Sequence, residues 1–397
     1  MPETSLPTLP IAADEFLLRP GISFLNHGSF GACPRPVFDT YQGWQRKLEE
    51  QPVEFLGRQI NTLLAEARAS LATYLGTQAS NLVYVPNATY GVNIVARSLE
   101  LGPGDEVLAS DHEYGACDRA WRFVCERRGV RYINQPIGLP VESAEALVEQ
   151  LWAGVTERTK VIFLSHITSP TALIFPLAAI CRRAREHGIM TVIDGAHAPG
   201  QIDLALDELG ADFYTGNCHK WLCAPKSAGF LYARPERQAL LHPLVVSWGW
   251  ESQTPGVSPF IDYFEWRGTH DPAAYLSVPA AIAFQAQHDW PRVRAACHAL
   301  LLDASHRIAA LSGLPQISPD TTEWWSQLRT IPLPPCNLTA LKDRLWDEYQ
   351  IEVPMVGWRG GHYVRVSIQC YNSPNDIDRL VEALTRLLPE TAEGVGG

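Results

Sequence analysis

Short apolar runs alternate with longer segments of helical periodicity through the middle of the chain. Runs of strand length occupy residues 82–85, 106–110, 130–134, 161–165 and 190–194. Helical patterns separate them over residues 89–99, 114–128 and 177–187; Gly129 ends the second and Pro176 opens the third. Strands joined by crossover helices in this way pair in parallel. The pattern predicts an α/β fold with a mostly parallel central sheet flanked by helices.

The pattern changes in the second half of the chain. Residues 226–233 predict a strand of alternating small and large apolar residues, and proline and aromatic residues crowd 240–266, which predicts loops. Beyond these lie a helical pattern over 272–311, a strand near Thr330, a helix over 338–349, strands at 351–354 and 363–368, and a helix over 374–388. A chain of 397 residues exceeds one ordinary domain. We predict an N-terminal arm (1–20), a large domain (21–270) and a small C-terminal α+β domain (271–390).

Composition narrows the class of protein. Hydrophobic residues make up 46% of the sequence and charged residues 19%, which suits packed domains and argues against disorder. The net charge is -11, and no Lys/Arg cluster could neutralise a run of phosphates, so we expect no nucleic-acid partner. Every apolar stretch is too short to span a bilayer, so we expect no membrane partner.

Cysteine usage and the N-terminus predict the compartment. The nine cysteines are odd in number and scattered, with no Cys-x-x-Cys pair, which is typical of a reduced protein. The first twenty residues lack the basic and apolar regions of a signal peptide. We therefore expect a soluble, cytoplasmic protein. Asp111, His112 and Glu113 lack a second ligand cluster at a suitable spacing, so we expect no metal site.

Three features fall where open parallel sheets bind ligands, at strand ends or helix starts. Asn87-Ala88-Thr89 begins a predicted helix and could hold a phosphate, or Asn87 could be a plain N-cap. Asp194 ends an apolar strand, where a carboxylate needs a cationic or donor partner or serves as an N-cap. Lys220 lies among apolar neighbours that would lower its amine pKa, unless it extends to solvent.

One cofactor accounts for all three features. Pyridoxal 5'-phosphate (PLP) requires an amine for a Schiff base, a carboxylate at its pyridinium nitrogen and a phosphate cradle. The sequence also resembles the class V group of fold-type I PLP enzymes, and most closely its isopenicillin-N-epimerase-like branch. Seven segments carry the resemblance: LNHGSFGACP (25–34), YVPNATYGVN (84–93), DHEYGA (111–116), VIDGAHAPGQ (192–201), TGNCHKWLCAP (215–225), WRGTHD (266–271) and VRVSIQCYN (364–372). They span nearly the whole chain in order.

The resemblance implies roles around the cofactor ring. Lys220 corresponds to the Schiff-base lysine, Asp194 to the partner of the pyridinium nitrogen, and His197 to the donor to the phenolate. Tyr114 occupies the position of the ring that stacks on the cofactor, which we prefer to His112.

The resemblance also implies contacts to phosphate and substrate. The phosphate ligands would be Ala88, Thr89, Asn217 and His219, with Asn217 at a position that is often serine in relatives, and Thr269 of a neighbouring subunit. The latter implies a homodimer with a shared active site. The substrate ligands would be Arg365, pairing with a carboxylate, and the loop residues Asn26, His27 and Gly28.

The implied chemistry takes place at Cα of an α-amino acid or its conjugate, through an external aldimine and a quinonoid. The resemblance favours an isopenicillin-N-epimerase-like reaction. The alternatives are a C–S lyase acting on a cysteine thioether or sulfoxide conjugate, as in ergothioneine-type pathways, a class V aminotransferase, and a PLP-binding protein without turnover. The combination of Lys220, Asp194 and Arg365 argues against the last, since a pure binder needs no carboxylate clamp.

Cysteine desulfurases also resemble this chain, but they carry a catalytic cysteine on the loop before the final arginine-containing strand. Residues 351–365 contain none, so we expect no persulfide formation. The aromatic side chains between Trp248 and Trp266 could line a roomy substrate pocket, the core or a dimer contact.

Overall fold

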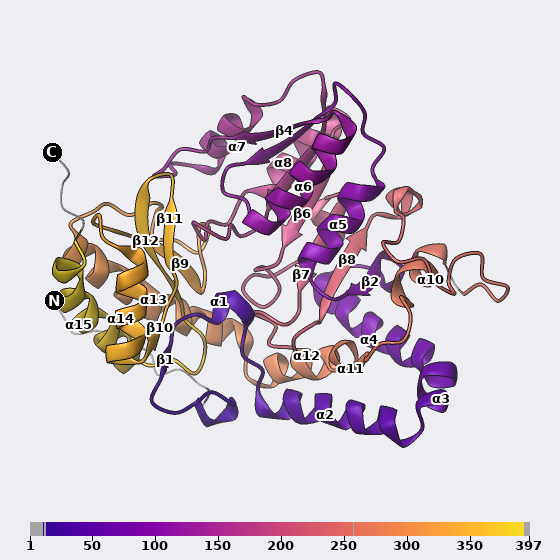
Figure 1. Ribbon diagram of the computed structural model, residues 1–397, viewed down its shortest axis with the longest axis horizontal. Helices are drawn as coiled ribbons and strands as arrows, with labels where there is room; N and C mark the ends of the chain where they lie inside the picture. Colours follow the sequence, from indigo (N-terminus) through magenta and orange to yellow (C-terminus); the bar gives the residue numbers. More distant parts are fainter. Residues whose placement is uncertain (1–10, 12, 257, 393–397) are drawn as a thin grey trace.

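The computed structural model describes residues 11, 13–256 and 258–392 (Figure 1). Most of the predicted N-terminal arm lies outside these residues. A seven-stranded sheet with the order β2-β8-β7-β6-β5-β3-β4 forms the centre of the larger part of the molecule. The strands are β2 (Leu82–Val85), β3 (Glu106–Ser110), β4 (Arg131–Gln135), β5 (Thr159–Ser165), β6 (Met190–Gly195), β7 (Phe213–Asn217) and β8 (Gly229–Ala233).

The central sheet confirms the predicted α/β class. Strands β4, β3, β5, β6 and β7 pair in parallel, whereas β8 is antiparallel to both β7 and β2. Every residue of β3 and every residue of β5 except Lys160 is buried, as expected for strands covered by helices on both faces. The covering helices include α5 (Ala88–Ser98), α6 (Gly115–Arg128), α7 (Ala144–Trp152) and α8 (Leu177–Glu186) (Figure 1).

A smaller antiparallel sheet, β11-β12-β9, lies in the C-terminal part. Its strands are β9 (Leu328–Leu333), β11 (Met355–Trp358) and β12 (Gly361–Ser367), with α13 (Trp290–Ser312), α14 (Leu338–Tyr349) and α15 (Pro374–Glu390) beside them. Near the N-terminus, β1 (Ser23–Phe24) pairs in parallel with β10 (Ile351–Glu352). Residues 23–24 therefore join the C-terminal part, although the sequence places them in the large domain. The predicted domain boundaries stay predictions.

The N-terminal helices connect the two parts. They are α1 (His27–Phe30), α2 (Arg35–Glu50), α3 (Pro52–Glu54) and α4 (Ile60–Leu75). Helices α2 and α4 pack against α11 (Ala273–Leu276) and α12 (Val278–Gln287). The single helical pattern predicted over 272–311 is thus three helices. Asp289 adopts a φ of 47°, which ends α12, and Pro291 then stands in the first turn of α13.

One further difference concerns residues 240–266. Most of this stretch is irregular as predicted, but Pro259–Glu265 forms α10. Ser258 accepts a hydrogen bond from the Ile261 N–H and so caps the helix, and Pro259 stands in its first turn. Within the described residues, no helix is both long and apolar enough to cross a membrane.

Candidate active site

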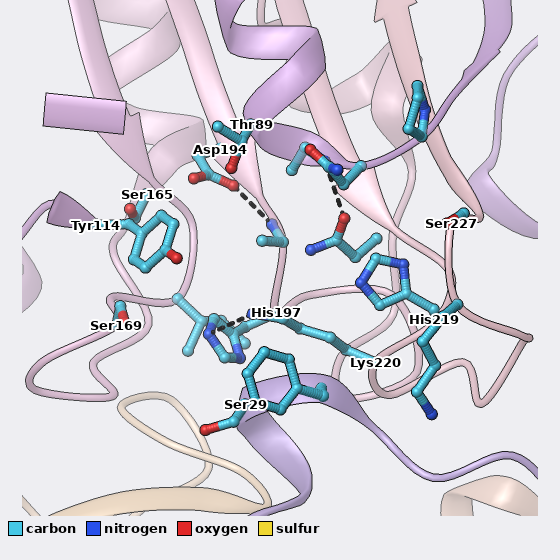
Figure 2. Close-up of a pocket in the computed structure, with 18 residues that line it drawn as sticks. Ser29, Thr89, Tyr114, Ser165, Ser169, Asp194, His197, His219, Lys220 and Ser227 are labelled. Atoms are coloured by element: carbon cyan, nitrogen blue, oxygen red, sulfur yellow. Dashed lines mark hydrogen bonds between the residues drawn. The ribbon is translucent and has the colours of Figure 1, made fainter. Parts of the chain in front are cut away.

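A cavity of about 470 Å³ opens at the carboxyl ends of the central strands, where α5 begins (Figure 2). Strand pairing brings Ser165, Asp194 and Thr215 into register on β5, β6 and β7, so residues that are distant in sequence meet at this edge. The cavity is lined by Ser29, Phe30, Pro86, Asn87, Ala88, Thr89, Tyr114, Ser165, Ile167, Ser169, Asp194, Ala196, His197, Asn217, His219, Lys220, Lys226 and Ser227.

Lys220 lies in the turn that follows β7, with its amine 3.2 Å from Nε2 of His197. Burial lowers the Lys220 pKa to about 8, and the nearby Asp194 carboxylate opposes this shift. Two glycines allow close packing around the turn. A side chain at Gly31 would meet the His219 carbonyl oxygen, and one at Gly200 would meet the Trp221 carbonyl oxygen, in each case at less than 2.5 Å. The amine therefore stands on a tightly held loop.

Asp194 is the penultimate residue of β6, and its carboxylate lies inside the cavity (Figure 2). Its two oxygens accept hydrogen bonds from the Ala196 N–H at 2.9 Å and from the Cys117 thiol at 3.3 Å. Burial raises the Asp194 pKa, and these hydrogen bonds oppose the rise. Among the described residues, Asp194 has no ion-pair partner. A buried carboxylate of this kind fits a ligand that brings its own cationic N–H group, as a pyridinium ring does.

The N-terminus of α5 forms the other end of the cavity. The Ala88 N–H donates to the Asn217 side-chain oxygen at 2.8 Å, and Thr89 lines the wall beside it. Nδ1 of His219 bonds the Ala228 carbonyl oxygen at 3.0 Å, so Nε2 is the remaining polar atom of that ring. Backbone and hydroxyl donors at a helix start suit a phosphate group, which would compete with the Asn217 oxygen for the Ala88 N–H. Lys226 and Ser227 also line this cavity, and neither was predicted from the sequence as a site residue.

Tyr114 and His112 occupy different environments. Tyr114 precedes α6, lines the cavity and exposes 45% of its surface. His112 is fully buried, where its ring nitrogens bond the Thr171 hydroxyl at 2.7 Å and the Ile137 carbonyl oxygen at 3.1 Å. His112 does not line the cavity. Of the two rings, only Tyr114 is placed to contact a ligand there.

Arg365 lies on β12 and does not itself line the cavity, but it contacts two of the lining serines. One guanidinium nitrogen donates to the Ser169 carbonyl oxygen at 2.5 Å and to its hydroxyl at 3.2 Å, and the other nitrogen lies 3.5 Å from the Ser29 hydroxyl. The third, Nε, is buried without a hydrogen-bond partner. Burial lowers the Arg365 pKa to about 10. Arg365 has no acidic ion-pair partner among the described residues, which fits a carboxylate ligand.

The residues predicted for the substrate loop do not line the cavity. Residues a few positions later in the chain line it instead. The Asn26 side chain donates to Glu352 at 2.9 Å, and the His27 ring bonds the Tyr371 hydroxyl and the Lys220 carbonyl oxygen. Neither residue lines the cavity. His27 instead stabilises the turn that carries Lys220, through its hydrogen bond to the Lys220 carbonyl oxygen. Ser29 and Phe30 provide the lining. About one turn of helix separates the two sets, a difference that the family resemblance did not resolve.

Thr269 lies in an exposed position after Gly268 and is absent from the lining of this chain's own cavity. The aromatic side chains of the same region also lie elsewhere. Phe260 and Phe264 are buried in the core, whereas Trp248 and Trp266 line a second cavity of about 490 Å³ against α4. These aromatic residues therefore do not form walls of the site around Lys220.

Glu113 is a buried acid that the sequence analysis weighed only as a metal ligand. Its carboxyl group accepts hydrogen bonds from the Ser110 hydroxyl at 2.5 Å and from both the N–H and the hydroxyl of Ser165 at 2.7 Å. Burial raises the Glu113 pKa to about 8. The described residues include no cluster of three or more potential metal ligands. Glu113 instead ties β3 to β5 immediately before Tyr114.

The cavity presents an amine, a buried carboxylate and a helix N-terminus at the carboxyl edge of a mainly parallel sheet, and beside it lies an arginine with no acidic partner among the described residues. This combination defines a PLP-dependent enzyme of fold type I. The aminotransferase class-V family model matches residues 32–380, so the chain belongs to that family. Its cofactor is PLP.

Particular relatives narrow the comparison. The chain is 37% identical over 390 residues to isopenicillin N epimerase of Amycolatopsis lactamdurans, which covers 95% of this chain and 98% of the relative. It is 28% identical to putative L-cysteine desulfhydrase 1 of Oryza sativa subsp. japonica, and the alignment covers 93% of this chain and 84% of the relative. A solved structure of the cystine C-S lyase C-DES with cysteine persulfide aligns with a TM-score of 0.80 at 21% identity, covering 94% of this chain and 99% of that one.

Proposed function

We propose that this enzyme epimerises an α-amino acid or its conjugate at Cα. The Arg365 guanidinium, which has no acidic partner among the described residues, is the observation that carries the substrate class, because a buried cation beside the cavity needs an anionic partner. The similarity to the Amycolatopsis epimerase over almost the full length of both chains supports the reaction type. The substrate is thus a small molecule with a free α-carboxylate.

Bound PLP would supply an electrophilic aldehyde and a ring that withdraws electrons from Cα. We assign Lys220 to hold its aldehyde carbon covalently and Asp194 to accept a hydrogen bond from its ring N–H. His197 would donate to the phenolate oxygen, and Tyr114 would contact the ring. The phosphate ligands would be Ala88, Thr89, Asn217 and His219. Each of these residues lines the one cavity, which supports the assignment.

Lys220 would also transfer the Cα proton. An amine with a pKa near 8 is partly deprotonated at neutral pH, so it can accept a proton and then return it. Ser29 and Ser169 hold the Arg365 guanidinium in place, and Arg365 would in turn orient the substrate carboxylate. Epimerisation requires a proton to reach Cα from the face opposite to Lys220, so a second proton donor would act on that face.

A C–S lyase reaction is the second candidate, supported by the similarity to the rice desulfhydrase. It would share every step up to removal of the Cα proton. Incubating the purified enzyme with L- and D-amino acids and cysteine conjugates distinguishes the reactions. A change of chirality without pyruvate supports the epimerase, whereas pyruvate release identifies a lyase. No cysteine is among the described residues that line the cavity, so free L-cysteine should yield no persulfide.

Replacing Arg365 with lysine should weaken substrate binding. The variant keeps the positive charge but loses the two parallel N–H donors that match a carboxylate. We expect KM to rise by roughly tenfold or more, with a smaller change in kcat. Steady-state kinetics on the true substrate measures both values. A preference for decarboxylated amines, or an unchanged KM, would contradict the assigned role.

We also infer a homodimer in which Thr269 of one subunit contacts the phosphate in the other. The exposed position of Thr269, outside its own chain's cavity, supports this arrangement. We further infer a cytoplasmic location, because the nine cysteines form no disulfide within the described residues.

Mixing two inactive variants tests the shared site. Lys220→Ala and Thr269→Ala chains should restore activity when they form hybrid dimers, because one of the two sites in each hybrid is intact. Random pairing should recover about a quarter of the wild-type activity. Lys220→Ala mixed with Asp194→Ala is the control, since both changes affect the same side of the site. Hybrids that form without any recovery would refute the shared site.

A further inference from the structure

Trp221 follows Lys220 in the chain, and its side chain is hydrogen-bonded to His197, which lies beside the Lys220 amine. Its side chain is fully buried, and the indole N–H donates to Nδ1 of His197 at 3.2 Å. The ring also packs against His27, with the centroids 4.9 Å apart. Gln285 donates to the Trp221 carbonyl oxygen at 2.8 Å, and Gly200 passes close to the same atom. The indole therefore has a fixed position.

This contact determines where His197 carries its proton. An indole N–H is a donor only, so Nδ1 of His197 must offer a lone pair. The imidazole is neutral, because burial lowers the His197 pKa well below its usual range. Lys220, Arg365 and His27 lower it further whenever they carry a positive charge. A neutral imidazole with an unprotonated Nδ1 carries its hydrogen on Nε2.

The protonated Nε2 lies next to the Lys220 amine. The Nε2 to Nζ distance is 3.2 Å, and both residues line the cavity (Figure 2). The Nε2–H group can donate only to a lone pair, so the amine accepts this hydrogen bond in its neutral form. The same N–H would serve an acceptor oxygen of a ligand that enters the cavity. The opposite tautomer would place two N–H donors against each other at Nδ1.

We propose that Trp221 is a positioning residue that holds His197 in the Nε2–H tautomer. Through this tautomer, His197 presents a hydrogen-bond donor to the cavity and favours the neutral amine of Lys220. The proposal extends the role assigned above to His197 as donor to the phenolate oxygen of PLP, and it rests on that role where the loaded enzyme is concerned. The tautomer itself belongs to the protein without cofactor.

The first test observes the tautomer directly in the enzyme freed of cofactor. Protein labelled with ¹⁵N-histidine gives nitrogen resonances that distinguish a protonated from an unprotonated ring nitrogen, and the His197→Gln variant assigns the His197 signals. We expect protonation at Nε2 alone in the wild type. Trp221→Phe, which keeps an apolar ring but loses the N–H group, should give a mixture of tautomers. A wild-type ring protonated at Nδ1, or a variant that keeps the pure Nε2–H form, would overturn the proposal.

Trp325→Phe is the matched control. Trp325 is also fully buried and donates its indole N–H, but to the Pro319 carbonyl oxygen in the C-terminal part. The substitution removes the same group and creates a comparable space, so any general loss of packing should affect both variants. The His197 resonances of Trp325→Phe should match the wild type. If they shift as in Trp221→Phe, the effect is not specific to the contact.

The second test uses the loaded enzyme and a double-mutant cycle. Trp221→Phe should lower kcat by about tenfold in the wild-type background, with KM changed less than about twofold. In a His197→Gln background, Trp221→Phe should lower kcat only slightly further, because an amide has no tautomer to select. Equal losses in both backgrounds would show a structural role only. If no substrate is turned over at all, the proposed function fails while the resonances of the cofactor-free enzyme still decide the tautomer.

Discussion

Replacing Lys220 with alanine should abolish turnover while the chain still folds. The change removes both the covalent attachment point for the cofactor and the amine assigned to the Cα proton, so kcat should fall by on the order of 10⁴-fold. Folding should persist, because burial already disfavours the charged amine, as its lowered pKa shows. Activity assays and thermal melting of the purified variant measure the two effects. Retained turnover would remove Lys220 from the mechanism.

Labelling distinguishes Lys220 from the second lysine at the cavity. Lys226 also lines it, with its amine donating to the Gly31 carbonyl oxygen at 2.9 Å. Borohydride reduction of the loaded enzyme should attach the cofactor to the peptide that contains Lys220. The label should survive in Lys226→Ala and disappear in Lys220→Ala. A label on Lys226 would transfer the anchoring role to that residue.

The predicted strands show what the sequence determines well. Apolar runs in a parallel sheet buried on both faces stand out, so β2, β3 and β6 were located within one or two residues. Strand β7, with the sequence FYTGN, was missed because its second half is polar or small and carries no apolar run. The break between α12 and α13 was also missed, since it depends on the left-handed backbone of Asp289.

The candidate site shows where sequence reasoning ends. Asp194 and Lys220 could be brought together from the chain alone, because one cofactor requires both a carboxylate and an amine and the segments around both residues resemble the same family. Ser29 and Ser169 could not, since they meet Arg365 across 336 and 196 positions of sequence. Contacts of this range depend on how β12 and α1 pack on the central part. The shift from Asn26 and His27 to Ser29 has the same origin.

Replacing Asp194 should impair both cofactor binding and catalysis. Its carboxylate is buried with two neutral donors and has no ion-pair partner among the described residues, so its charge is left to stabilise a bound cationic N–H group. Asp194→Asn is the sharper variant, because it preserves the shape and an oxygen for the Ala196 N–H while removing the charge. We expect cofactor affinity and turnover at saturating cofactor each to fall by about tenfold or more.

The same substitution should have the opposite effect on the cofactor-free protein. Burial raises the Asp194 pKa in the folded chain, so ionisation above the pKa of the unfolded chain destabilises the fold, and this cost grows with pH through the folded pKa. At neutral pH and without cofactor, the melting temperature of Asp194→Asn should therefore equal or exceed that of the wild type. When both proteins are loaded with PLP, the variant should melt at the lower temperature. Thermal melts with and without PLP measure this reversal. Near-normal turnover in the variant, or equal melting shifts in both states, would contradict a role for the charge in holding the cofactor.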